Sequence, residues 1–246
     1  MIPTARPLSR RVLAAVAVAV ALLLAACTGG DGDGGGADDT AALQDRLTTA
    51  RATIDDAETV EVSISASEVP DGVSGLLSAQ GTGNHSPAFQ GDVKVSTGGA
   101  TLTAEVVAVE GTVYAKTDIT PTFLTIDPAS LRAPDPAALL DTETGVTQIL
   151  SSTEDLREGE RSRDGSDVLT SITGTLPGTV VAQIIPSASQ QATFDVTYRL
   201  DDDDVLRDAT MTGPFYGDGT SVTYTVRLTT SDEPVEITAP PGLGGA

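Results

Sequence analysis

The sequence has little of several residue types that often mark a function. Its 246 residues include one cysteine, one histidine, no tryptophan and only eight phenylalanines and tyrosines. A lone cysteine excludes an internal disulfide and a CxxC metal site. Aromatic side chains usually dominate core burial, so we expect valine, leucine, isoleucine and alanine to fill that role.

Basic side chains are also scarce, because 14 lysines and arginines stand against 35 acidic residues. The formal net charge of −21 opposes binding to phosphate backbones, which argues against a nucleic-acid partner. Three of the basic residues lie in residues 1–26, which hold no Asp or Glu, so the chain from Cys27 onward carries −24. A hydrophobic content of 39% is enough for a folded core.

Residues 1–26 are typical of a lipoprotein signal peptide. Arg10 and Arg11 precede an apolar run over residues 12–26, VLAAVAVAVALLLAA. This run is shorter than the roughly 20 residues of a spanning helix but suits a signal peptide. It ends in Leu24-Ala25-Ala26-Cys27, which resembles a bacterial lipobox. The alternative is an ordinary signal peptide or N-terminal anchor with an incidental cysteine.

The lipobox predicts that the Cys27 thiol carries a diacylglyceryl group. Two acyl chains suffice for stable anchoring, so we expect an extracytoplasmic protein held at the outer leaflet of the cell membrane. Residues 27–39 then form the lipidated cysteine and a flexible tether rich in glycine and aspartate. Residues 40–246 leave room for one domain.

The domain has alternating segments that predict strands, with helical patterns at its start and middle. Leu43, Leu47, Ala50 and Ile54 fall on one face of a helix over 41–57. Asp127-Pro128 and Asp135-Pro136 indicate helix starts, and further short helices are predicted around 146–150 and at 178–185. Strands are predicted at 60–66, 75–82, 89–96, 100–109, 112–117, 154–161, 167–174, 192–200, 205–213, 220–230 and 235–238. Because the strands are grouped, the pattern favours an α+β fold with antiparallel meanders.

Residues that could support catalysis or metal binding are few, and we expect neither an enzyme nor a cofactor. His85 lies in a polar loop and is expected to be solvated, and no serine lies in a G-x-S-x-G motif. Neither a phosphate-binding loop nor a set of zinc ligands is present. The four aspartates at 201–204 are either a solvated turn or a calcium site.

An ordered set of short segments resembles the LppX/LprAFG family of mycobacterial-type cell-envelope lipoproteins, including LprG-like members. The segments, together with the lipobox, are Val113-Tyr114, Ile126-Asp127-Pro128, Asp135-Pro136, Leu139-Leu140, Gly145, Ile149-Leu150, Gly174-Thr175-Leu176-Pro177-Gly178, Ile184-Ile185-Pro186, Thr197-Tyr198-Arg199-Leu200-Asp201, Thr212-Gly213-Pro214-Phe215-Tyr216, Val222-Thr223-Tyr224-Thr225, Pro234-Val235-Glu236-Ile237 and Ala239-Pro240.

The resemblance implies a strongly curved antiparallel half-barrel sheet, with helices covering its concave face and enclosing a hydrophobic cavity. A similar architecture occurs in the Lol lipoprotein carriers. It also implies binding of acylated lipids or glycolipids and their transport across the cell envelope. The expected partners are this ligand, the membrane through the Cys27 anchor, and a membrane lipid transporter as a further candidate.

Strand alternation and helix periodicity indicate which side chains would line such a cavity. The expected residues are Val62, Ile64, Val93, Val95, Leu102, Ala104, Val106, Val113, Ile149, Leu150, Val181, Ile184 and Ile185. The alternative is that they are ordinary core residues. In that case the protein would be a structural or adaptor lipoprotein that acts through protein contacts.

Overall fold

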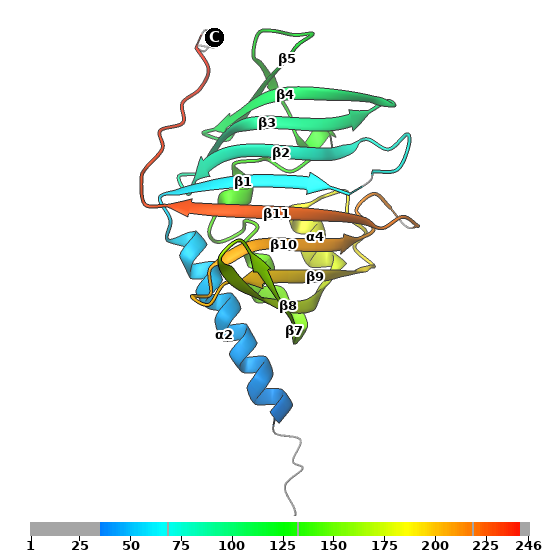
Figure 1. Cartoon of the computed structure of the whole chain (residues 1–246). Coiled ribbons are helices and arrows are strands. Elements are labelled where there is room, and N and C mark those ends of the chain that lie inside the picture. Colours follow the sequence, from blue (N-terminus) through cyan, green and yellow to red (C-terminus); the bar gives the residue numbers. More distant parts are fainter. Residues whose placement is uncertain (1–34, 68, 132, 218, 242–246) are drawn as a thin grey trace, which may run out of the picture. The chain divides into compact units, whose positions relative to one another are not determined.

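The computed structural model describes residues 35–241 except 68, 132 and 218 (Figure 1). Cys27 and the expected signal peptide at 1–26 lie outside the described residues. Residues 40–246 form one compact unit. Within the described residues, no helix has both the length and the hydropathy needed to cross a bilayer.

The fold is built on an open sheet of eleven strands in the spatial order β6-β5-β4-β3-β2-β1-β11-β10-β9-β8-β7. Every neighbouring pair is antiparallel. The first and last strands pair at the centre, so a meander extends to each side of them (Figure 1). The strands are β1 (Thr59–Ala66), β2 (Gly75–Asn84), β3 (Ala88–Thr97), β4 (Ala100–Val109), β5 (Thr112–Thr117), β6 (Leu124–Ile126), β7 (Glu154–Asp164), β8 (Asp167–Pro177), β9 (Thr193–Leu200), β10 (Leu206–Gly213) and β11 (Val222–Ser231).

Two strand predictions differ from the structure. The segment at 235–238 is not a strand, because β1 and β11 are already paired on both sides and Pro234 and Pro240 bound the segment. It lies instead over the sheet, where Ile237 packs with Ala88 and Val107. The short strand β6 was not predicted, since three residues give too little alternation to detect.

The helices pack on one face of the sheet, which we call the inner face. They are α2 (Gly35–Asp55), α3 (Gln148–Ser152), α4 (Gly178–Ile184) and the 3₁₀ turn η2 (Ala138–Leu140), whereas the 3₁₀ turn η1 (Ala129–Leu131) has no buried residue. Strands β6 and β7 are opposite edges of the sheet, so the chain between them must cross it, and it carries η2 and α3. At Gly83 a Cβ atom would lie 2.0 Å from Leu140 of η2, so only glycine permits this close approach.

The predicted helix starts at Asp127 and Asp135 give short 3₁₀ turns. The Oδ1 of Asp127 accepts the N–H of Ala129 at 3.0 Å, and that of Asp135 accepts the N–H of Ala137 at 2.9 Å. The carboxylates therefore cap the chain as expected, but each turn ends after three residues.

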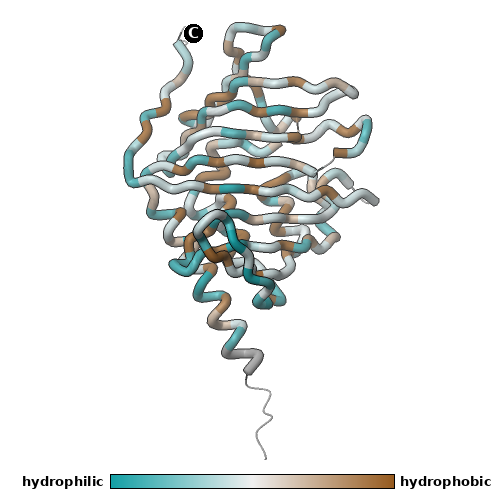
Figure 2. The backbone as a smooth tube through the Cα atoms, in the orientation of Figure 1, coloured by the Kyte–Doolittle hydropathy of each residue, from teal (hydrophilic) through white to brown (hydrophobic). Residues whose placement is uncertain are grey.

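The core lies between the inner face and the helices, and its aromatic content corrects the expectation from composition. Leu47 and Ala50 of α2 are fully buried in it. Six of the eight aromatic side chains belong to this cluster or pack against it: Phe89, Phe194, Tyr198, Phe215, Tyr216 and Tyr224. Apolar residues recur along the strands and helices in Figure 2. Aromatic residues are scarce in the sequence, but the fold concentrates them in one layer.

Candidate functional site

The register of the sheet places all eight strand residues expected to line a cavity on the inner face. Ile64, Val93 and Ala104 lie in one row across β1 to β4. Val95 and Leu102 are opposite each other in the next row. The rest of the set shares this face: Val62, Val106 and Val113.

Burial divides the thirteen expected residues into two groups. The buried ones are Val106, Val113, Ile149, Leu150 and Val181. The half-buried ones are Val62, Ile64, Val93, Val95, Leu102, Ala104, Ile184 and Ile185. We call the six half-buried strand residues the aliphatic surface. It occupies the inner face of β1 to β4, and part of each side chain is accessible.

Most of the inner face of β8 to β10, by contrast, is buried. Phe194, Tyr198 and Phe215 are fully buried there. The ring of Phe215 meets that of Phe194 edge-on at 4.9 Å between centroids, a favoured aromatic geometry. The Tyr198 hydroxyl lies 2.8 Å from Thr153 Oγ1, and burial raises the pKa of this tyrosine. This half of the face therefore offers a ligand less apolar surface than β1 to β4, with Met211 of β10 half-buried.

Two tyrosines join the halves at one end of the sheet. Tyr216 lies in the loop between β10 and β11, and its hydroxyl accepts the N–H of Leu76 at 3.0 Å. The Tyr224 hydroxyl donates to the Leu76 carbonyl at 2.8 Å and is hydrogen-bonded to the Tyr216 hydroxyl. Burial, and then the bond to Tyr216, raise the pKa of Tyr224.

Sequence reasoning did not find the contact of this tyrosine pair with β2, because Tyr216 and Leu76 are 140 residues apart. It also missed several half-buried apolar residues that pack against the same core. Alternation within β1 could have identified Ala66, whereas the β-bulge between Leu76 and Ser78 shifts the alternation in β2. The missed residues are Ala66, Leu76, Ala115 and Met211.

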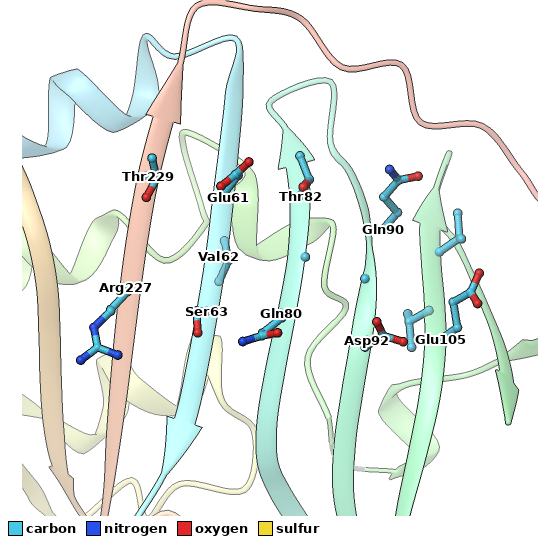
Figure 3. A pocket seen from close by; sticks show the side chains of 14 residues that line it. Glu61, Val62, Ser63, Gln80, Thr82, Gln90, Asp92, Glu105, Arg227 and Thr229 are labelled. Carbon is cyan, nitrogen blue, oxygen red and sulfur yellow. The ribbon is translucent and has the colours of Figure 1, made fainter. Parts of the chain in front are cut away.

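An open groove of about 770 Å³ lies on the outer face, opposite the helices. Figure 3 shows side chains of β11, β1, β2, β3 and β4 along it. Its charged residues are Glu61, Asp92, Glu105 and Arg227, all exposed. The groove is therefore polar, and it is distinct from the hydrophobic cavity expected between the sheet and the helices.

His85 corrects the expectation of a solvated loop residue. Its Nδ1 lies 2.6 Å from the Leu140 carbonyl oxygen, and its Nε2 lies 2.8 Å from that of Ile54. His85 thus ties the hairpin between β2 and β3 to the end of α2 and to η2.

Of the four aspartates at 201–204, Asp201 and Asp204 have structural partners, and Asp202 and Asp203 are exposed. Asp201 accepts the N–H groups of Asp203 and Val205 and an N–H of Arg207. Asp204 forms an ion pair with Arg46 of α2. Across the described residues, no group of three His, Cys, Asp or Glu side chains is placed to hold a metal ion. The turn therefore anchors α2.

Comparison with known proteins identifies the family. LprF from Mycobacterium bovis shares the fold, with a TM-score of 0.66 and 16% sequence identity, covering 82% of this chain and 98% of LprF. LppX from Mycobacterium tuberculosis has a TM-score of 0.59 and 18% identity, covering 80% of this chain and 99% of LppX. No curated protein sequence gives a significant match. Residues 39–238 match the LppX_LprAFG lipoprotein family, and the chain belongs to this family, as the sequence motifs predicted.

Proposed function

We propose that this protein is a lipid-anchored carrier that binds acylated lipids or glycolipids on the aliphatic surface and moves them across the cell envelope. One observation carries the proposal: the inner face of β1 to β4 presents aligned, half-buried aliphatic side chains beside a filled aromatic core. An acyl chain lying there would complete the burial of these residues. The family assignment supports the same function.

The energetics of acyl chains explain why such a surface is useful. Burying one CH₂ group is worth about 0.8 kcal/mol, so moving a chain of about 15 such groups into water costs about 12 kcal/mol. A carrier lowers this cost by offering equivalent apolar contact. Flexible aliphatic side chains such as Val95 and Leu102 suit a mobile acyl chain, since they impose no rigid planar slot.

A pair of valine-to-tryptophan variants tests the proposal. Val95 is half-buried on the aliphatic surface, whereas Val196 is 2% exposed in the filled half. Val95→Trp should reduce uptake of a fluorescent acyl probe with little change in stability. Val196→Trp should destabilise the fold by about 1–3 kcal/mol or more through overpacking. Because the natural chain has no tryptophan, each variant also carries a single fluorescent reporter.

Mass spectrometry of lipids extracted from the purified chain is the direct measurement. The chain from residue 28 onward serves here, because it contains every residue of both apolar clusters and omits Cys27. Co-purified acylated lipid, displaced in Val95→Trp, is the expected result. A chain that yields no lipid and takes up no acyl probe would refute the carrier function.

The filled half of the inner face favours a second candidate, a structural or adaptor lipoprotein. In that case the whole inner face is ordinary core. Both tryptophan variants would then be destabilised to a similar degree, and affinity purification of the anchored protein would yield a protein partner without lipid.

The location proposed for this protein is the outer leaflet of the cell membrane, with the anchor on Cys27. Metabolic labelling with a palmitate analogue should label the expressed full chain. The Cys27→Ser variant should lose the label and leave the membrane fraction. Persistent labelling of Cys27→Ser would place the lipid elsewhere.

A further inference from the structure

The exposed large apolar side chains of the described residues are concentrated in one segment. Ile119 is 84% exposed, Leu124 is 53% exposed and Leu131 is 66% exposed. All three lie within thirteen residues, between the end of β5 and the end of η1. Single exposed apolar residues are ordinary on protein surfaces, whereas a concentration of them marks an interaction site. We call Ile119, Leu124 and Leu131 the apolar rim.

Ile119 and Leu124 of the apolar rim lie near the end of the sheet that holds the turn between β3 and β4. Ile119 follows Thr117, which pairs with Ala104 in β4. Leu124 pairs with Ala115 on the inner face and lies in β6, an edge strand. Val95 and Leu102 of the aliphatic surface lie near the same end, beside the turn between β3 and β4. Ile119 and Leu124 therefore lie next to the half-buried part of the inner face, and Leu131 follows in η1.

The length of the chain before this unit indicates what covers the rim. Only twelve residues, 28–39, separate Cys27 from Thr40, the start of the compact unit. An extended chain of that length spans at most about 45 Å. With Cys27 lipidated, the folded unit is confined close to a bilayer. Residues 117–131 contain only two charged residues, Asp118 and Asp127, so insertion of the rim desolvates little charge.

We propose that the apolar rim is a bilayer-docking site, which inserts into the lipid surface and places the open end of the aliphatic surface against the membrane. This inference rests on the proposed function, since the docked position is where an acyl chain would move between bilayer and protein. The high negative charge of the chain makes zwitterionic vesicles better targets than anionic ones.

A single tryptophan reports docking directly, because the chain has none of its own. Ile119→Trp, made in the chain from residue 28 onward, keeps an apolar side chain at the rim. Its fluorescence should shift to shorter wavelength with phosphatidylcholine vesicles and should be quenched by brominated phosphatidylcholine. Ser86→Trp is the matched control, since Ser86 is exposed in the turn between β2 and β3 at the opposite end of the sheet. It should show neither response.

Charge substitutions measure the contribution of the rim to vesicle binding. Ile119→Asp and Leu124→Asp should each weaken partitioning onto phosphatidylcholine vesicles about tenfold in a flotation assay, and Ser86→Asp should not. Thermal melting checks the fold of each variant. If Ile119→Asp melts early, Ile119→Ser replaces it. Equal quenching at residues 119 and 86, or partitioning unchanged by both aspartates, would overturn the proposal.

Two further outcomes separate docking from its alternatives. Self-association that is abolished by Ile119→Asp, without vesicle binding, would assign the rim to a second copy of the chain and overturn bilayer docking. Normal uptake of a fluorescent acyl probe from solution by a chain that does not bind vesicles would retain the carrier function and reject the docking site. Vesicle docking without acyl uptake would retain the docking site and reject the carrier function.

Discussion

At the scale of single residues, His85 joins three elements through two hydrogen bonds to backbone carbonyls. His85→Ala would leave both carbonyls without this partner, so we expect it to reduce the free energy of unfolding by about 1–3 kcal/mol. Urea denaturation measures the change. Ser86→Ala alters the neighbouring exposed residue and should stay within about 0.5 kcal/mol of the natural chain. Equal stability of the two variants would show that the hydrogen bonds of His85 do not stabilise the fold.

Asp141 gives a pH-dependent contribution to stability. Its Oδ1 accepts the N–H of Thr144 at 2.7 Å, the Thr144 hydroxyl at 2.9 Å and the N–H of Glu143 at 2.9 Å. These bonds, led by the Thr144 backbone, hold the pKa of this carboxyl below its usual value of 3.8. Because the pKa of Asp141 is lower in the folded state, the ionised carboxylate stabilises the fold at pH values above 3.8. This contribution is lost as the pH falls through the lowered pKa.

The Asp141→Asn variant tests this sign. We expect it to be less stable than the natural chain at neutral pH, and the difference should shrink as the pH falls below 3.8. Acid titration of unfolding by circular dichroism measures both. Asp232→Asn changes an exposed carboxylate near the C-terminus and is the matched control. A stability difference that is independent of pH would contradict the assignment.

At the scale of elements, α2 is held to the rest of the fold by arginines as well as by its apolar face. Arg51 donates to Asp55 Oδ2 at 3.0 Å, to Ser151 Oγ at 2.9 Å and to the Thr142 carbonyl at 2.9 Å. It therefore connects α2 to α3 and to the preceding loop. The apolar periodicity of α2 was readable in the sequence, but these partners are distant in the chain and were not.

Removal of this connection should be measurable. We expect Arg51→Ala to lower the free energy of unfolding by about 1–3 kcal/mol, because bonds to Ser151 and Thr142 are lost together. The exposed Arg227→Ala on the outer face should change it by about 0.5 kcal/mol or less. Chemical denaturation measures the free energy of unfolding of both variants. Similar changes in the two would show that α2 is held by apolar packing alone.

At the scale of the whole molecule, the two halves of the sheet differ in how completely the helices cover them. Strands β8 to β10 carry fully buried residues such as Tyr198 and Val196, whereas β1 to β4 carry the half-buried aliphatic surface. Local opening requires less free energy where fewer apolar contacts are lost. We therefore expect slower amide hydrogen exchange in β8 to β10 than in β3 to β5.

Hydrogen exchange followed by mass spectrometry checks this difference on the chain from residue 28 onward. Addition of a fatty acid or phospholipid should slow exchange mainly in β1 to β4, where the ligand would complete the burial. Uniform protection across both halves without ligand would indicate that the aliphatic surface is part of a rigid core.

The sequence by itself determined the family, the α2 helix and ten of the eleven strands of the sheet. Periodicity is a local property, so the side chains of Leu47 or Val62 could be assigned to a face from their neighbours alone. The tertiary structure decided which half of that face is filled. Coverage depends on where the crossing chain from β6 to β7 and the Tyr216–Tyr224 pair meet the sheet, and contacts between residues far apart in the chain leave no periodic signal.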